Sequence, residues 1–176
     1  MTKLILSLTL LVLSISSSAS TLDPLEVRLG YAKGTKLLII NADDYGMSHS
    51  ENMGTRKVLA QGIVTSATIM IPPPWSHEAL KHIKKSGMKN IGVHVTLTSE
   101  WDKYKWRPLT RDQDGKSSLI GKDGYFWETS EQVEKNAVME DVIREVRAQL
   151  ETPIKRGIEL SHFDSHMGSL YGLFTG

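Results

Sequence analysis

Three polar clusters supply the side chains of this sequence that are suited to chemistry. Asp43 and Asp44 follow the apolar run 37–40. His94 lies in a segment rich in β-branched residues, and His166 ends the sequence Ser-His-Phe-Asp-Ser-His. One carboxylate and two imidazoles commonly hold a divalent ion while leaving positions open for water and substrate. The second carboxylate would remain free as a base toward water whose pKa the ion lowers. These residue types are typical of metal-assisted hydrolysis.

Each cluster also has a purely structural interpretation when it is taken alone. Two adjacent aspartates after a strand often form an Asx turn, and His94 in a strand can be a hydrogen-bonded core histidine. His162 and Asp164 share a strand face with His166, and either side chain can orient a neighbouring imidazole by a hydrogen bond. The agreement of three clusters at successive strand ends favours the functional interpretation.

The segments around these clusters predict a β-α-β-α-β-loop-α-β order, which is typical of a mainly parallel α/β fold. The expected strands are 36–42, 63–71, 90–98 and 158–164, and the expected helices end near Ala60, Lys85 and Lys155. Ser48 or Ser50 is the expected N-cap of the first helix, and Gly87 is expected to end the second. Residues 37–40 show no polar alternation, which indicates a strand covered on both faces. Because ligands bind beyond the carboxyl ends of the strands in such sheets, the three clusters are expected to meet there.

The last expected helix has both a start signal and an apolar stripe. Thr129 and Gln132 match a capping box, and one helix is expected from there to Lys155. Its buried face is predicted by apolar residues at helical spacing, namely Val138, Val142, Val146 and Leu150. Before this helix, residues 99–128 form a loop rich in aromatic residues, and a loop of that length is typical of a lid or a binding segment.

Residues 1–19 match a secretory signal peptide, with Lys3 as a basic start, an apolar run and a small residue at Ala19 before the cleavage point. The rival interpretation is a membrane anchor, but the apolar run is shorter than the ~20 residues that a span needs. We therefore expect a secreted or periplasmic protein with no stable membrane span once the signal is removed. A lead-in segment over 20–35 and one domain over 36–176 are expected to follow.

The composition argues against some classes of partner and of metal site. The sequence has 21 basic and 20 acidic residues, so the formal net charge is +1. This balance gives no reason to expect a nucleic-acid partner. The sequence contains no cysteine, which excludes disulfides and thiolate metal sites. A homodimer is left open.

The clusters belong to three motifs, which are NADDYG at 41–46, GVHVTLT at 92–98 and SHFDSH at 161–166. In this order and spacing they resemble the three N-terminal motifs of the YdjC-like carbohydrate deacetylases, the family of chitooligosaccharide deacetylase. GIVTSAT at 62–68 is similar to the second strand of that family. The resemblance covers residues 36–170.

The resemblance implies a TIM-like (β/α) barrel that removes N-acetyl groups from amino sugars such as chitooligosaccharides, using Mg²⁺ or Zn²⁺. By their positions in the motifs, Asp44, His94 and His166 resemble the metal ligands of the family. Asp43 resembles the general base, which would take a proton from metal-activated water as it attacks the acetamide. Members of the family are longer than this sequence, so it is expected to hold the N-terminal part of the barrel.

The aromatic residues of loop 99–128 suit the apolar face of a sugar ring, so Trp101 and Trp106 are the expected substrate contacts. Two other functions stay open. One is a catalytically inactive, truncated relative that binds sugar or metal without turnover. The other is a different metal hydrolase such as a phosphoesterase, which is disfavoured because the sequence has no Gly-rich phosphate-binding loop.

Overall fold

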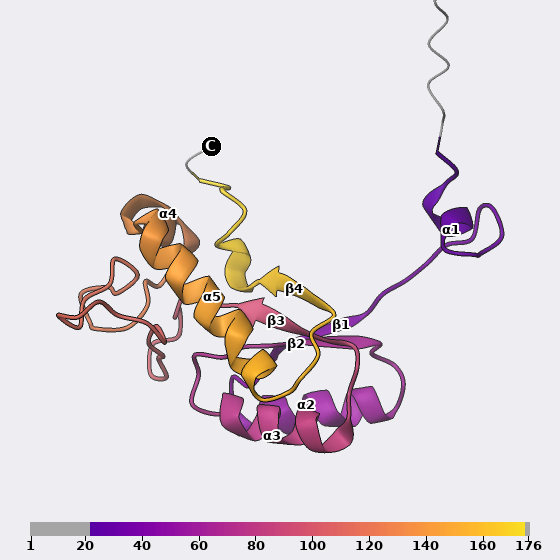
Figure 1. The fold of residues 1–176 in the computed structure, drawn as a ribbon, viewed down its shortest axis with the longest axis horizontal. Coiled ribbons are helices and arrows are strands. Elements are labelled where there is room, and N and C mark those ends of the chain that lie inside the picture. Colours follow the sequence, from indigo (N-terminus) through magenta and orange to yellow (C-terminus); the bar gives the residue numbers. More distant parts are fainter. Residues whose placement is uncertain (1–21, 175–176) are drawn as a thin grey trace, which may run out of the picture. The chain divides into compact units, whose positions relative to one another are not determined.

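The computed structural model describes residues 22–174, so the expected signal peptide lies outside the described residues. The chain divides between Leu38 and Ile39 into two compact units. The first unit contains a short helix, α1 (Leu25–Arg28), followed by turns. The second unit contains every other helix and strand drawn in Figure 1. Among the described helices, none has both the length and the apolar character needed to cross a membrane.

The second unit is built around a four-stranded parallel sheet in the order β1-β2-β3-β4. The strands are β1 (Asn41–Tyr45), β2 (Ser66–Ile69), β3 (Ile91–Val95) and β4 (His162–Ser165). The helices are α2 (His49–Ala60), α3 (Ser76–Ser86), α4 (Ser130–Asn136) and α5 (Met139–Lys155), and a 3₁₀ turn, η1 (His166–Gly168), follows β4. The predicted α/β class with a parallel sheet is confirmed.

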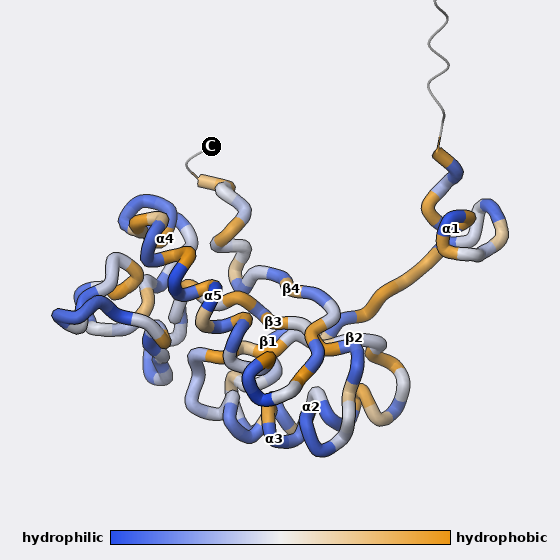
Figure 2. Tube along the Cα trace, in the orientation of Figure 1, coloured by the Kyte–Doolittle hydropathy of each residue, from blue (hydrophilic) through white to orange (hydrophobic). Residues whose placement is uncertain are grey.

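The apolar run before β1 is not the strand that its sequence predicts. Leu38 and Ile39 are 79% and 78% exposed, and Figure 2 shows the run as an orange stretch between α1 and β1. The strand begins only at Asn41, where pairing with Ser66 of β2 starts. The prediction failed because strand propensity describes how well a residue fits a pleated surface, and it does not say where a partner strand begins.

The sheet has one apolar and one polar face, so the expectation of a strand with two apolar faces is wrong as well. The apolar face packs in one core with residues of α2, α3 and α5, and it includes Ala42, Tyr45, Ala67, Ile69 and Val93. Figure 1 shows α2 and α3 together on one side of the sheet. Side chains alternate between the two faces of a strand. The other face carries hydrogen-bonded polar side chains, which are Asn41, Asp43, Ser66, Thr68, His94 and Asp164.

The predicted start signals of two helices are present in the structure. Ser48 is the N-cap of α2, and its side chain accepts a hydrogen bond from Glu51 N. Thr129 and Gln132 form the capping box of α4 as predicted. Each cap satisfies an amide that the first turn of a helix leaves without an internal partner.

The helix behind the capping box is not continuous, which corrects the prediction of one helix ending at Lys155. Ala137 and Val138 have extended backbone conformations and separate α4 from α5. The amide of Val138 donates to the hydroxyl of Ser118 at 2.8 Å. A loop side chain thus satisfies the amide at the break, and such a distant partner has no local signal in the sequence.

The predicted apolar stripe of α5 packs against the cores at Val142, Val146 and Leu150 but not at Val138, and two fully buried positions of the helix are polar. Glu145 and Gln149 are fully buried, whereas Val138 is 51% exposed. Val146 and Leu150 are partly buried and pack against the main core. The helix therefore presents hydrogen-bonding groups to the interior, with apolar side chains beside them.

The long loop 99–128 is packed around a core of its own. Trp106, Leu119 and Phe126 are buried together with Met70 and Leu97. Because Met70 follows β2 and Leu97 follows β3, this second core lies just beyond the carboxyl ends of the strands. The loop is therefore a structured part of the region where the polar clusters meet.

Candidate metal centre

Both aspartates at the end of β1 reach the polar side of the sheet. Strand pairing moves from Ala42–Ala67 to Tyr45–Ile69, which is three residues along β1 against two along β2. Asp44 lies in this irregularity with a left-handed φ of 58°. Adjacent side chains of a regular strand point to opposite faces, and a bulge removes that alternation. Asp43 and Asp44 can therefore both approach His94.

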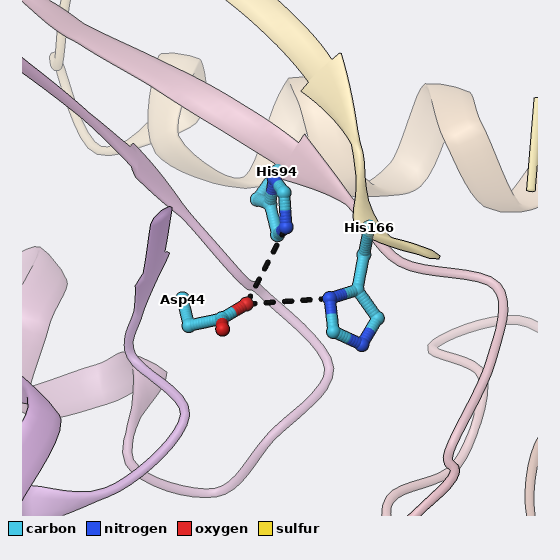
Figure 3. Close-up of side chains that lie close together, drawn as sticks. All are labelled: Asp44, His94 and His166. Atoms are coloured by element: carbon cyan, nitrogen blue, oxygen red, sulfur yellow. Dashed lines mark ion pairs between the residues drawn. The ribbon is translucent and has the colours of Figure 1, made fainter. Parts of the chain in front are cut away.

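The rings of His94 and His166 both face one carboxylate oxygen of Asp44, as Figure 3 shows. Oδ1 of Asp44 lies 3.4 Å from Nε2 of His94 and 3.2 Å from Nδ1 of His166. The two imidazole rings are 5.1 Å apart and nearly perpendicular, at 72°. Potential ligand atoms of the three residues all lie within 4.8 Å of one another. The structure thus brings together the three predicted metal ligands.

The chemistry of this cluster fits a cation. His94 and His166 are only 5% and 4% exposed. Oδ1 of Asp44 is buried and has no hydrogen-bond partner, although two ring nitrogens face it. Buried carboxylate oxygens are normally hydrogen-bonded or coordinate a metal ion. An orphaned oxygen facing two imidazoles is the donor set expected for a divalent transition metal.

Each of the two histidines also contacts a second carboxylate. Nδ1 of His94 lies 2.6 Å from Oδ1 of Asp164, so the imidazole that Asp164 contacts belongs to the neighbouring strand. Nε2 of His166 lies 3.1 Å from both carboxylate oxygens of Glu100. Glu100 was not predicted from the sequence. Its position just beyond the His94 strand, where the other acids of the site also occur, is the signal that would have found it.

Asp43 is exposed, and hydrogen bonds from the described residues reach only one of its two carboxylate oxygens. Its Oδ1 accepts hydrogen bonds from Asn41 Nδ2 at 2.5 Å and from Thr68 Oγ1 at 3.2 Å. The Thr68 hydroxyl also lies 3.1 Å from Oδ2 of Asp164. Both bonds to Asp43 reach the same oxygen, so Oδ2 takes part in neither. Thr68 and Asn41 were missed in the sequence, although alternation along β1 and β2 puts them on this face.

The charges of the cluster shift the pKa values of its members. Burial lowers the pKa of His166, but the close carboxylates of Asp44 and Glu100 outweigh it and raise the pKa to about 9. Burial acts to raise the pKa of Asp44, but the close imidazole of His166, followed by the charge of His94, holds it below its ordinary value. Without an ion, the cluster is an imidazolium paired with carboxylates, and binding a cation at His166 requires loss of that proton.

His162 lies on the same sheet face but is not part of the cluster. Its ring packs over Gly92, where a Cβ atom would approach the ring to 2.7 Å. Its Nδ1 is 2.8 Å from the hydroxyl of Ser161. The structure therefore gives the contact predicted for Asp164 but places His162 in the packing between β3 and β4.

The two tryptophans predicted to contact substrate differ in exposure. Trp101 is 46% exposed, whereas Trp106 is 2% exposed. Nε1 of Trp106 donates to the carbonyl of Thr98 at 2.8 Å, and its ring lies 6.2 Å from that of His166. A side chain so deeply buried does not fit a sugar contact, so this expectation is corrected for Trp106. The role of Trp101 stays a prediction.

Comparison with known proteins gives the site its family context. A family described as "YdjC-like protein" matches residues 37–174. The chain belongs to this family. The match includes Asp44, His94 and His166 and both carboxylates that contact the two histidines.

Relatives within the YdjC-like family carry the name carbohydrate deacetylase. The protein of that name from Thermus thermophilus is 35% identical over 151 residues, which are 85% of this chain and 50% of the relative. The one from Halalkalibacterium halodurans is 36% identical over 132 residues, which are 73% of this chain and 52% of the relative. The chain thus spans about half the length of the curated relatives it matches.

A solved structure supports the same fold. A crystal structure from Enterococcus faecalis V583, labelled a candidate cellobiose-phosphate cleavage protein, matches with a TM-score of 0.64 and 32% sequence identity. The match covers 76% of this chain and 52% of that one. The predicted family and its fold, here the part of a TIM-like barrel formed by β1 to β4, are therefore confirmed.

Proposed function

We propose that this chain carries the metal-binding half of a carbohydrate deacetylase that hydrolyses N-acetyl groups of amino sugars of the chitooligosaccharide kind. The observation that carries the proposal is the buried oxygen of Asp44 facing His94 and His166, with the exposed Asp43 beside it. The names of relatives at about one-third identity support the substrate class. Ligands of α/β folds bind at this edge of the sheet.

Asp44, His94 and His166 are the proposed ligands of a divalent ion. Two imidazoles and one carboxylate suit Zn²⁺, and the neighbouring carboxylates also permit Mg²⁺. When bound, the ion supplies a Lewis acid that polarises the acetamide carbonyl and lowers the pKa of a nearby water. The buried imidazoles limit the access of bulk water, so charge interactions at this position are stronger than at the surface.

Asp43 is the proposed general base. Asn41 and Thr68 hold its Oδ1, so the other oxygen can accept a proton from water as that water attacks the carbonyl carbon. Breaking the C–N bond then releases acetate and the sugar amine. The proton held by Asp43 is available for that amine, which balances the reaction.

The test is acetate release from N,N′-diacetylchitobiose by the purified chain with Zn²⁺ or Mg²⁺ added. Asp43→Asn is the catalytic variant, and Asp23→Asn, in the first structural unit, is the matched control. We expect release by the wild type and by Asp23→Asn, and a loss of at least about 100-fold in Asp43→Asn, as for a removed general base. Equal rates in all three proteins would contradict the assignment of Asp43.

The alternative function is binding of sugar or metal without turnover. Metal binding that is lost in Asp44→Asn, together with no acetate release by the wild type, would favour this alternative. Phosphate release from a sugar phosphate without acetate release would instead favour a phosphoesterase.

A further inference from the structure

Each histidine of the metal cluster has a carboxylate partner of its own, and the two pairs use opposite ring nitrogens. His94 contacts Asp164 through Nδ1 and faces Asp44 with Nε2. His166 contacts Glu100 through Nε2 and faces Asp44 with Nδ1. In both residues one nitrogen is paired with a carboxylate and the other points toward the proposed ion.

We propose that Glu100 is the positioning residue of His166, which fixes the ring so that Nδ1 binds the ion. This inference rests on the proposed function, because it assigns a role within the same metal site. A carboxylate that accepts the N–H on one side of an imidazole leaves the other nitrogen as the free electron-pair donor. Glu100 therefore sets both the orientation and the tautomer of His166.

The backbone that carries Glu100 is held firmly. The preceding residue, Ser99, is fully buried. Its amide donates to the carbonyl of Trp127 at 2.8 Å, and its hydroxyl accepts from the amide of Trp106 at 3.0 Å. A positioning residue needs such support, because a mobile carboxylate would not select one ring orientation.

Packing restricts the ring of His166 from other directions. The Trp106 ring meets it at 63°, with centroids 6.2 Å apart, and the His94 ring is 5.1 Å away. Glu100 supplies what packing alone cannot, because an imidazole flipped by half a turn fills almost the same space. A hydrogen-bond acceptor at Nε2 distinguishes the two orientations, because the flipped ring would present a carbon atom there.

Glu100 is not placed as a further ligand of the same ion. Its two oxygens lie at Nε2 of His166, on the opposite side of the ring from the nitrogen that faces Asp44. Its side chain is 23% exposed, so it lies at the border of the cluster. These observations indicate that Glu100 orients His166 and does not itself bind the ion.

The first test measures Zn²⁺ affinity of the whole chain by isothermal titration calorimetry, without sugar. Glu100→Gln keeps the size of the side chain and removes its charge. The matched control is Glu128→Gln, which alters a carboxylate at the end of the same loop that is 60% exposed. We expect Glu100→Gln to weaken Zn²⁺ binding about 10–100-fold, as for other partners of metal-binding histidines, and Glu128→Gln to bind as the wild type does.

The second test needs no variant. In the Zn²⁺-loaded wild type, ¹⁵N NMR of the imidazoles should show His166 with a protonated Nε2 and a metal-bound Nδ1. The reverse assignment would overturn the proposal even if Glu100→Gln failed to fold.

Unchanged affinity in a folded Glu100→Gln variant would overturn the role of Glu100 and leave the metal site intact. A wild type that binds no Zn²⁺ would overturn both the metal site and this role. Acetate release without a defect in Zn²⁺ binding by Glu100→Gln would leave the proposed function standing and reject only this inference.

Discussion

The side-chain amide of Gln149 pairs with the backbone of Thr96, two residues beyond His94. Its Oε1 accepts from the amide of Thr96 at 2.9 Å, and its Nε2 donates to the carbonyl of Thr96 at 2.8 Å. Strand β3 ends one residue earlier, at Val95. The Gln149 side chain therefore supplies the hydrogen bonds that a neighbouring strand would otherwise give to Thr96. Helix α5 thereby fixes the end of the strand that carries His94.

Replacing Gln149 with Leu should destabilise the fold. The amide and carbonyl of the buried Thr96 would lose these partners, and a buried unpaired group costs roughly 1–3 kcal/mol. Urea denaturation would measure the loss. Arg147→Leu, at an exposed position of the same helix, should stay within about 0.5 kcal/mol of the wild type. Equal midpoints for the two variants would show that the pairing with Thr96 contributes nothing.

Asp44→Asn should abolish metal-dependent stabilisation while keeping the fold. Asn tolerates the left-handed backbone of position 44 about as well as Asp does, but it is a poor ligand for a cation. In a thermal shift experiment with Zn²⁺, the wild type should gain about 2.7 kcal/mol when the free ion is at about 100 times its dissociation constant. Asp44→Asn should gain nothing at that concentration. A full shift in the variant would remove Asp44 from the ligand set.

Gly92→Ala should disturb the pairing of β3 with β4. A Cβ atom there would lie 2.7 Å from both the carbonyl oxygen and a ring carbon of His162. The ring can move, but the carbonyl belongs to the paired strand. Overpacking of this kind costs about 1–3 kcal/mol. The variant's urea midpoint should fall, and the double variant Gly92→Ala/His162→Ala should recover only part of it, because the backbone contact remains. Complete recovery would show that the clash with the His162 ring alone causes the destabilisation.

Asp141 should make stability depend on pH in the acid range. Its Oδ2 accepts from the amide and the hydroxyl of Ser118, both at 2.7 Å. The bond from the Ser118 amide, followed by those from its hydroxyl and from Arg144, holds the pKa of Asp141 below its ordinary value. The stabilisation is therefore complete above the unfolded pKa of about 3.9, and it is lost as the pH falls through the lower pKa of the folded state.

Asp141→Asn should accordingly be less stable than the wild type near pH 7, and the difference should shrink below about pH 3.9. Urea denaturation of both proteins across this range measures the trend. A difference that stays constant with pH would mean that the Asp141 charge is not responsible.

Trp101 and Trp106 should respond differently to replacement by Ala. Trp101→Ala should raise KM for an acetylated sugar and leave the unfolding free energy almost unchanged, since the exposed ring is available to the sugar. Trp106→Ala should cost about 3–5 kcal/mol of stability, as for a buried aromatic residue. Activity assays with urea denaturation distinguish the two effects. An unchanged KM in Trp101→Ala would remove it from the substrate site.

Signals within a few residues predicted the local structure well. The capping box of Thr129 and Gln132 and the N-cap at Ser48 are present because each depends on side chains within three residues of the helix start. Glycine also marked the end of α3 correctly, since Gly87 adopts the left-handed conformation with φ of 67°. Such features depend little on the rest of the fold.

Features that depend on distant partners were missed. The apolar run with Leu38 and Ile39 looks the same in sequence whether or not a neighbouring strand covers it. Gln149 looks like a surface residue until Thr96, 53 positions away, is known to lie beside it. For the site, the motifs indicated which side chains would meet. Glu100 escaped notice because its partner, His166, is 66 positions away.

The left-handed conformation of Asp44 limits which amino acids can occupy that position. Short polar residues such as Asp and Asn reach this region most readily, and longer or β-branched residues reach it at a cost. A glutamate would also offer a carboxylate, but it would add strain and move the oxygens away from the two imidazoles. Among the residues of this cluster, position 44 is therefore the one at which the backbone conformation, in addition to the side-chain chemistry, limits substitution.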